Sequence, residues 1–371
     1  MGATLREIAD AAGVSVRTVS NVVNNYKHVS PAMRAAVQKQ LTAFGYAPNL
    51  HARSLKRGKS DLLALVLPEL DNPYFAELAR EVVEYGAELG YTVMIDHTNG
   101  DAERERQLIL YAGQTALFDG LIVSPLGLSH ADLEPVVPQQ PVVFLGEDLH
   151  PGFDHVSIDN RAAAIEATNH LLSLGCKSVV ALGGETTLNP MSALRRAGYY
   201  EALVAAGIPS AQHRAVLSYG FERRHGAEAM QHILAEELPP DGVFCLTDTL
   251  AHGALRAIHN AGLRVPEDIA VLGFDDIAES QYSTPTLTSV SPDKTQIART
   301  CLDLVISRVN GTGEPPRHHV TPHTLVVRES TMRDSAVLND TVLKSTVLKT
   351  TARENPVVAP SDHVTSSSTQ P

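Results

Sequence analysis

Residues 11–25 read AAGVSVRTVSNVVNN, a glycine turn followed by a short helical pattern. Val19, Val22 and Val23 fall on one side of that pattern, and the other side carries mostly polar residues. So short a helix is marginal in isolation. We therefore expect the valines to pack on neighbouring helices while the polar side faces a partner.

The residues before this stretch predict a first helix. Thr4 and Glu7 match the capping box, which opens a helix that runs to about Ala12. Gly13 supplies a tight corner, and the hydroxyl of Ser15 can cap the second helix. A helix, a glycine turn and a second helix make up the helix-turn-helix motif, whose second helix enters the DNA major groove. On spacing alone, an ordinary helical hairpin is the alternative.

A third helix follows. Ser30-Pro31 provides an N-cap and a proline at the first helical position, and Gly45 ends the helix just after Phe44. Eight residues can close a small three-helix core: Ile8, Ala9, Val14, Val19, Val23, Met33, Val37 and Leu41.

Charge separates this head from the rest of the chain. Residues 1–60 contain nine basic and two acidic residues, a net charge of +7. The whole chain carries −12, so the remaining 311 residues carry −19. This asymmetry indicates a nucleic-acid-binding head on an acidic body, which itself repels DNA.

Composition excludes several other classes of protein. No window approaches 18 uninterrupted apolar residues, and the N-terminus is a polar capped helix, so we expect neither a membrane span nor a signal peptide. Cys176, Cys245 and Cys301 lie far apart in apolar segments. Their odd number and spacing favour buried free thiols in a reducing cytoplasm over disulfides or a zinc site.

Two series of short apolar runs alternate with helical patterns from residue 62 to about 330. The expected strands are 62–68, 92–96, 120–125 and 141–146, then 178–184, 214–219, 242–246 and 269–274. Amphipathic helices such as 72–90 and 160–175 lie between them. Strands that are apolar on both faces suit a parallel sheet covered by helices. We expect an α/β core of two doubly wound lobes, with ligands at the carboxyl ends of the strands.

Many α/β enzymes share this alternation, but their motifs are missing. The turn ELDNPY after the first strand has no glycine, so the dinucleotide fingerprint is absent, as are the P-loop and the nucleophile elbow. His318, His319 and His323 straddle Pro322 in an expected strand, which argues against a shared metal site. We predict no enzymatic activity, no cofactor and no metal.

The head and hinge resemble the lactose/galactose repressor family. The resemblance rests on TLREIADAAGVSVRTVSNVVNN and on VSPAMRAAVQKQLTAFGYAPNLHARSLKRGKS. It continues, in the family's order, through NPYFAELA, SIDNRAAA, RRAGYYEAL, TDTLAHGALRAI, RVPEDIAVLGFDD, TPTLTSV and LVVREST. It covers residues 3–332.

The resemblance implies a homodimeric transcription regulator, usually a repressor, that binds double-stranded operator DNA. It also implies a periplasmic-binding-protein-like core that holds a small sugar-like effector between two lobes. Lobe closure would then change operator affinity. The alternatives are a periplasmic-type solute-binding protein, which would need a signal peptide, and an α/β enzyme.

The resemblance also assigns DNA contacts. Val16, Arg17 and Asn21 occupy the base-reading positions, where Arg17 suits guanine and Val16 suits a thymine methyl. The family often carries arginine where this chain has Asn21, and asparagine pairs best with adenine, so we predict A·T where relatives read G·C. Five residues are expected at phosphates, which set register: Ser15, Thr18, Ser20, Asn24 and Ser30.

Residues 47–57, APNLHARSLKR, match the family's hinge helix. In the family this segment folds on operator DNA, pairs with its dimer mate and inserts a leucine into the minor groove. Leu55 matches that leucine, with Lys56 beside it. A loose basic linker is the alternative.

Carried over by resemblance, ten residues form the effector site: Tyr74, Phe75, Ser124, Glu147, Arg195, Phe221, Thr247, Asp248, Asp275 and Lys294. Carboxylates and an arginine can fix vicinal hydroxyls, while aromatic faces cover the apolar side of a ring. The two aspartates could instead cap turns, and the second-lobe phenylalanine could be core. The lysine favours an acidic sugar and Glu147 opposes one, so we expect a monosaccharide or close derivative, neutral rather than acidic.

These assignments divide the chain into a DNA-binding domain (1–46), a hinge and linker (47–60) and a core (61–332). The lobes are expected to span 61–159 plus about 292–318, and 160–291 plus about 319–332. In the tail, 333–371, the repeat TVLKS/TVLKT has a period of five and makes no heptad seam. We expect the tail to be mostly disordered and not to form a tetramerising coiled coil.

Overall fold

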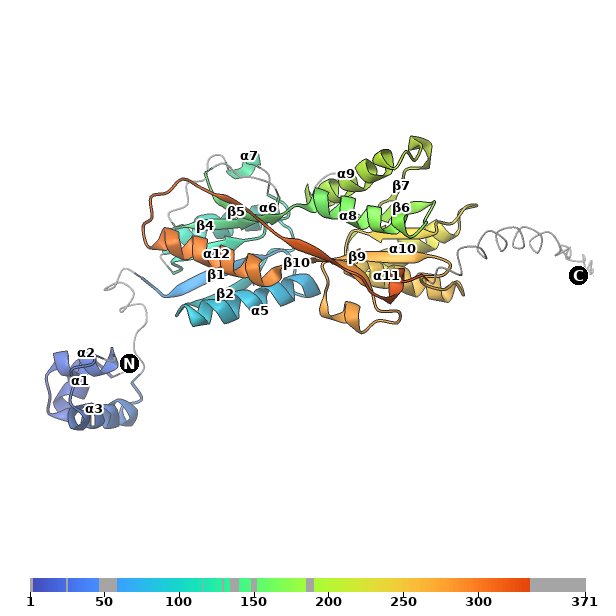
Figure 1. Cartoon of the computed structure of the whole chain (residues 1–371). Helices are drawn as coiled ribbons and strands as arrows, with labels where there is room; N and C mark the ends of the chain where they lie inside the picture. Colours follow the sequence, from blue (N-terminus) through green and yellow to red (C-terminus); the bar gives the residue numbers. More distant parts are fainter. Residues whose placement is uncertain are drawn as a thin grey trace, which may run out of the picture.

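The computed structural model contains a small helical head and a two-lobed α/β core (Figure 1). It describes residues 3–24, 26–46, 59–115, 117–128, 130–133, 140–147, 152–184 and 190–333. Within these ranges no helix is both long and apolar enough to cross a membrane. The predictions for the hinge, including Leu55 and Lys56, and for the tail from residue 334 fall outside the described residues.

The head consists of the three predicted helices, α1 (Leu5–Ala12), α2 (Val16–Val23) and α3 (Pro31–Ala43). The capping box is confirmed: the Glu7 amide donates to the Thr4 hydroxyl at 3.3 Å, and the Thr4 amide donates to the Glu7 carboxylate at 2.7 Å. Gly13 adopts a φ of 66°, the left-handed conformation that glycine takes without steric cost.

The core of the head differs from the predicted one at the first turn of α3. Met33 is 42% exposed, so its assignment to the core was wrong. Val22 of α2, which was not predicted, is buried, whereas the predicted Val14 and Val23 are only partly buried against the core. The buried set is Ile8, Ala9, Val19, Val22, Val37 and Leu41.

The first lobe is built on a six-stranded parallel sheet. Its strands in spatial order are β11 (His318–Thr321), β5 (Asp154–Ile158), β4 (Val142–Leu145), β3 (Gly120–Val123), β1 (Leu62–Leu67) and β2 (Thr92–His97). The chain order reverses between β1 and β3. In doubly wound sheets, ligands bind at the carboxyl ends of the strands beside such a reversal.

The second lobe repeats this plan. Its strands in spatial order are β12 (His323–Val326), β10 (Thr288–Pro292), β9 (Ala270–Phe274), β8 (Gly242–Cys245), β6 (Val179–Leu182) and β7 (Arg214–Val216). β12 runs antiparallel to β10, and the other pairs are parallel. The predicted fold class, two doubly wound lobes behind a helix-turn-helix head, is confirmed.

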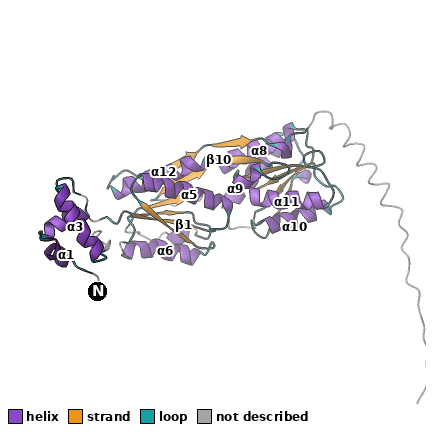
Figure 2. Cartoon of the chain, turned by 90° about the horizontal axis from the view of Figure 1, so that it is seen from below, coloured by secondary structure: helices purple, strands orange, loops and turns teal. Residues whose placement is uncertain are grey.

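Helices cover both faces of each sheet (Figure 2). In the first lobe α5 (Pro73–Glu88) packs with α12 (Lys294–Val309) on one face, and α6 (Ala102–Thr115) lies on the other. In the second lobe α8 (Asn160–Ser173) packs with α9 (Pro190–Ala205), and α10 (Arg223–Leu234) packs with α11 (Asp248–Asn260). Shorter elements are α7 (His130–Leu133), η1 (Ser210–Gln212), η2 (Ala278–Gln281) and η3 (Glu329–Thr331).

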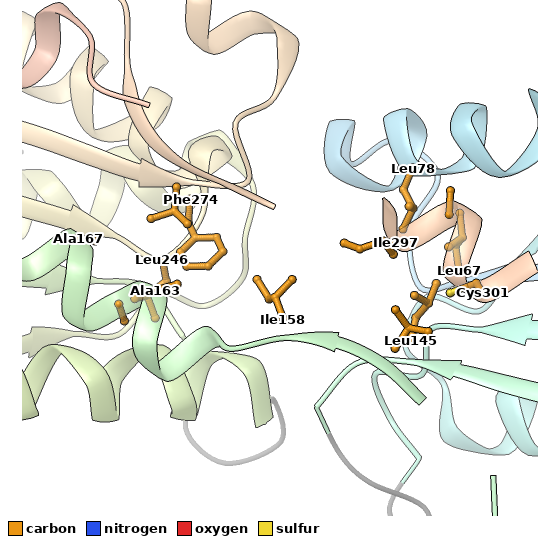
Figure 3. Packing of buried hydrophobic residues seen from close by; sticks show 14 of the residues in the cluster. Leu67, Leu78, Leu145, Ile158, Ala163, Ala167, Leu246, Phe274, Ile297 and Cys301 are labelled. Carbon is orange, nitrogen blue, oxygen red and sulfur yellow. The ribbon is translucent and has the colours of Figure 1, made fainter. Parts of the chain in front are cut away.

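The chain crosses between the lobes three times, after β5, after β10 and between β11 and β12. Because β11 belongs to the first sheet, the last crossing lies at Pro322, later than the change expected at 318–319. Buried side chains run up to these crossings from both sides. In Figure 3, Ile158 at the end of β5 lies between Ile297 of the first lobe and Phe274 of the second.

Four strands are absent from the two predicted series, and for β5 and β10 the reason is chemical. Both strands bury polar side chains, which interrupt the apolar pattern that marks a strand. Those groups are paired: Arg308 donates to both oxygens of Asp154, and Thr288 hydrogen-bonds Thr331 at 2.8 Å. A buried polar group is tolerated when it has such partners.

Candidate functional site

Helix α2, the predicted recognition helix, is held at its first turn by its own cap. The Ser15 hydroxyl accepts the Thr18 amide at 3.1 Å and lies 2.9 Å from the Thr18 hydroxyl. Val16 is 43% exposed, Arg17 is exposed and Asn21 is half-buried. An exposed valine beside an exposed arginine on a capped helix presents an apolar contact and a forked donor on one face.

The predicted phosphate contacts lie around the same helix. Asn24 ends α2 and donates to the Ser20 carbonyl at 2.7 Å and to the Ser20 hydroxyl at 3.3 Å. Ser30 caps α3 by accepting the Met33 amide at 3.3 Å. The structure thus places all the base-reading and phosphate candidates on or beside α2 and at the start of α3.

A cavity of about 150 Å³ lies between the two lobes. Eight predicted effector residues line it: Tyr74, Phe75, Ser124, Glu147, Arg195, Phe221, Thr247 and Asp275. Each follows the carboxyl end of a strand, or lies in the helix or loop after it, as expected for doubly wound lobes. The structure therefore brings together side chains as far apart in the sequence as Tyr74 and Asp275.

Arg195 of α9 is the polar centre of the cavity. Its Nε donates to Asn160 Oδ1 at 2.7 Å, Nη1 donates to the Leu246 carbonyl, and Nη2 lies 3.5 Å from Asp275 Oδ1. The guanidinium carbon is 3.4 Å from the centroid of the Phe274 ring. The residue is only 4% exposed, so its charge is held in one orientation by these partners.

Asn160 extends the network to the first lobe. Its amide nitrogen donates to Glu147 Oε1, while its amide oxygen accepts from Arg195. Burial raises the pKa of Glu147, and the nearby Arg195 opposes that rise. Asn160 therefore links the charged groups of the two lobes without lining the cavity itself.

Burial also acts on Asp275, which follows β9. It raises the pKa of Asp275 from 3.8 to about 6, against the opposing charges of Arg195 and then Lys294. The backbone at Asp275 has a φ of 109°, which side-chain-bearing residues rarely adopt. Such strained residues cluster at ligand sites.

Aromatic rings close the apolar part of the cavity. Tyr74 and Phe75 pack edge to face at the start of α5, with centroids 5.3 Å apart. Asn72 caps that helix by accepting the Tyr74 amide at 3.1 Å, which fixes where both rings begin. Phe221 lines the cavity from the second lobe. Rings beside clustered polar groups are what a sugar ring requires.

The remaining two predicted residues do not line the cavity. Asp248 is fully buried below it and accepts from the Ile277 amide at 3.0 Å and from the Ser280 and Ser289 hydroxyls at 2.6 Å. Burial, and then the charge of Asp275, raise the pKa of Asp248 to about 8. Lys294 points away to Glu77. Their assignment as effector contacts is therefore corrected.

Several lining residues were not predicted, including Glu69, Ser157 and Met191. Glu69 and Asn72 stand together after β1, and the Asn72 amide donates to Glu69 Oε2 at 3.2 Å. Polar residues that directly follow an apolar strand were the available signal for Glu69. Ser157 gave no such signal, because it alternates with apolar residues inside β5.

Among the residues that the structure describes, the histidines and cysteines form no metal site. Within the described ranges, no group of three or more histidine, cysteine or acidic side chains could hold an ion. His318 bonds Ser157 at 2.8 Å and His323 bonds Glu166 at 3.2 Å, in strands of different sheets. The three cysteines are buried free thiols, as predicted.

Comparisons with known proteins match both parts of the chain. Residues 4–49 match the family "Bacterial regulatory proteins, lacI family", and residues 168–331 match "Periplasmic binding protein-like domain". The ribose operon repressor of Halalkalibacterium halodurans is 31% identical, over 88% of this chain and 97% of the relative.

Two solved structures extend the match to the fold of most of the chain. The lac repressor dimer bound to operator and the anti-inducer ONPF is 26% identical, with a TM-score of 0.78 over 90% of this chain and all of that one. The complex of the transcriptional regulator CelR with cellobiose is 30% identical, with a TM-score of 0.64 over 88% of this chain and 99% of that one.

Proposed function

The chain belongs to the lacI family of bacterial regulatory proteins, and from this we propose that it is a transcriptional repressor whose operator affinity is set by a small neutral sugar. One observation carries the proposal. A capped helix-turn-helix with an exposed recognition face stands on the same chain as a cavity between two lobes lined by rings, carboxylates and an arginine. One part suits DNA and the other suits a polyhydroxylated ring.

We assign base reading to Val16, Arg17 and Asn21. The exposure of the first two on a helix fixed by Ser15 supports this assignment, as does the net charge of +7 in residues 1–60. The phosphate contacts are assigned to Ser15, Thr18, Ser20, Asn24 and Ser30. Leu55 and Lys56 are assigned to the minor groove on the family resemblance alone.

Operator selection from random DNA tests the reading of Asn21. We expect the wild-type protein to select A·T at the base pair that Asn21 reads, and Asn21→Arg to select G·C there, because arginine pairs best with guanine. A good bidentate pair discriminates by about 1–3 kcal/mol, or roughly 5–150-fold. Arg34→Lys, in α3, is the control and should leave that position unchanged. An unchanged preference in Asn21→Arg would remove Asn21 from the base-reading set.

Charge decides between neutral and acidic effectors. Among the described residues that line the cavity, Arg195 is the one cation, against the carboxylates Glu69, Glu147 and Asp275. Arg195 is already paired with Asp275 and lies over the Phe274 ring. Lys294, the cation that would have favoured an acidic sugar, is paired with Glu77 at 2.8 Å. An anion would therefore meet unbalanced negative charge in a poorly solvated space.

A thermal-shift screen of the full chain tests the effector class. Neutral mono- and disaccharides, including ribose and cellobiose, should include at least one that stabilises the protein, by about 2.7 kcal/mol at a hundredfold excess over Kd. Gluconate and glucose 6-phosphate at the same concentrations are the matched acidic ligands and should have no effect. Stabilisation by the acidic ligands alone would reverse the proposed charge selection.

We also propose that the working form is a homodimer, because two heads must meet two half-sites of the operator. Exposed apolar side chains at one edge of the first lobe support this. Met94 and Ile95 of the edge strand β2 are 52% and 41% exposed, and Val83 of the adjacent α5 is 37% exposed. An unpaired strand edge with apolar side chains is a ready site for a second copy.

A further inference from the structure

Lys294 stands directly after a crossing between the lobes. β10 ends at Pro292 in the second sheet, and α12 begins at Lys294 in the first lobe. The lysine side chain is 13% exposed and Glu77, its partner on α5, is 23% exposed. The pair is therefore partly withdrawn from solvent at the crossing from β10 to α12.

Both members of the pair also bond to the second lobe. Lys294 Nζ lies 2.8 Å from Glu77 Oε2 and donates to the Asp276 carbonyl at 2.8 Å. The other oxygen of Glu77 accepts the Ala278 amide at 2.7 Å. One carboxylate and one ammonium of the first lobe thus hold two backbone groups of the segment that follows β9.

That segment also carries the cavity residue Asp275. Asp275 and Asp276 are consecutive and have φ values of 109° and 46°, so the chain turns sharply here. The Asp275 side chain faces the cavity and Arg195, whereas the carbonyl of the next residue faces Lys294. A shift of Asp275 towards a bound ligand would displace the groups held by Glu77 and Lys294.

We propose that Glu77 and Lys294 form an inter-lobe clasp that fixes the relative position of the lobes and couples the state of the cavity to operator affinity. This inference rests on the proposed function for its second half only. Allosteric coupling requires contacts that differ between two conformations of the molecule. The clasp joins α5 and α12 of the first lobe to the segment after β9 of the second lobe, so its hydrogen bonds would change when the lobes move. It also accounts for the placement of Lys294 outside the cavity.

The surrounding charges make the clasp specific to this pair. The Asp276 carboxylate is occupied by Arg328 at 2.7 Å and is not free to replace Glu77. Tyr74, a cavity residue one turn before Glu77, has its ring centroid 6.0 Å from Lys294 Nζ. Removal of either clasp member leaves the other charged, poorly solvated and without its partner. The relative position of the lobes seen in this structure is then less stable than in the wild type.

The test compares Glu77→Gln and Lys294→Met with the matched control Glu81→Gln. Glu81 lies one turn later on α5 and accepts from the Thr295 hydroxyl at 2.9 Å, a bond that stays within the first lobe. Spin labels on Glu88→Cys and Gln231→Cys, both exposed, report the distance between the lobes, since the native cysteines are buried. Dilution with unlabelled full-length protein removes distances between chains.

We expect both clasp variants to broaden or shift the ligand-free distance distribution, and to change affinity for the selected operator by at least about fivefold, the lower end of typical coupling. Glu81→Gln should match the wild type in both measurements. Unchanged distances in both clasp variants would overturn the clasp. Changed distances with unchanged operator affinity would overturn its coupling to DNA. Failure to select any operator would instead refute the proposed function, while the distances would still decide the clasp.

Discussion

Raising the salt concentration from 50 to 200 mM should weaken operator binding by about 10³–10⁵-fold. A protein that makes six to ten phosphate contacts releases a similar number of counterions, and that release supplies this dependence. A head with a net charge of +7 in each chain of a dimer can provide that number of contacts. The −19 of the remaining residues keeps the core away from DNA, so the salt dependence should reside in the head alone.

The slope of log affinity against log salt locates the responsible residues. Lys39→Gln, at an exposed position of α3, should reduce the slope by about one unit, because it removes one cation of the basic head. Lys177→Gln, an equally conservative loss of charge at an exposed position of the core, is the control and should leave the slope unchanged. A slope near zero in the wild type would contradict an electrostatic interface.

The helices of the head could be predicted from capping and turn residues that are close together in the sequence. The Thr4–Glu7 capping box, the Gly13 turn and the Ser15 cap depend on residues within a few positions of one another, and each is present. Eight of the twelve strands were also visible as apolar runs. Val22 was missed because helical periodicity cannot say which of the neighbouring residues Val22 and Val23 reaches the core, and nothing local showed that Met33, in the first turn of α3, is exposed.

The residues that line the cavity could not be predicted from short-range sequence patterns. Resemblance, not periodicity, brought Tyr74, Glu147 and Arg195 together, and the structure bears out that they share one cavity. Lys294 could not be placed in this way, because its orientation depends on Glu77, more than two hundred residues away. Asn160 was missed for a similar reason: its role is to bond two residues that the sequence does not connect.

Replacing Arg195 with methionine should lower the free energy of unfolding by about 3–5 kcal/mol, the usual result of removing one member of a buried ion pair. The variant leaves the carboxyl of Asp275 buried without its main cation, and Asn160 loses the donor at 2.7 Å. Arg161→Met is the control. It removes an exposed ion pair with Glu201, and such pairs contribute about 0–1 kcal/mol.

The pH dependence of this loss identifies its cause. In the wild type the pKa of Asp275 is raised to about 6, so below pH 6 its carboxyl is already neutral and needs Arg195 less. Above pH 6 the carboxylate is ionised and depends on the arginine. The destabilisation by Arg195→Met, measured by denaturant unfolding, should therefore be larger at pH 8 than at pH 5. An equal loss at both values would show that packing on Phe274, and not charge, is what the arginine supplies.

A second substitution separates stability from effector response. Asp275→Asn in the Arg195→Met background removes the uncompensated carboxyl, so it should recover part of the lost stability at pH 8, as expected for residues that act as a pair. It should not recover the response of operator binding to the sugar found in the screen, because both charged side chains that line the cavity from the second lobe are then changed. Neither residue belongs to the DNA-binding head, so operator binding without ligand should persist in both variants. A double variant that responded to the sugar like the wild type would place the effector elsewhere in the molecule.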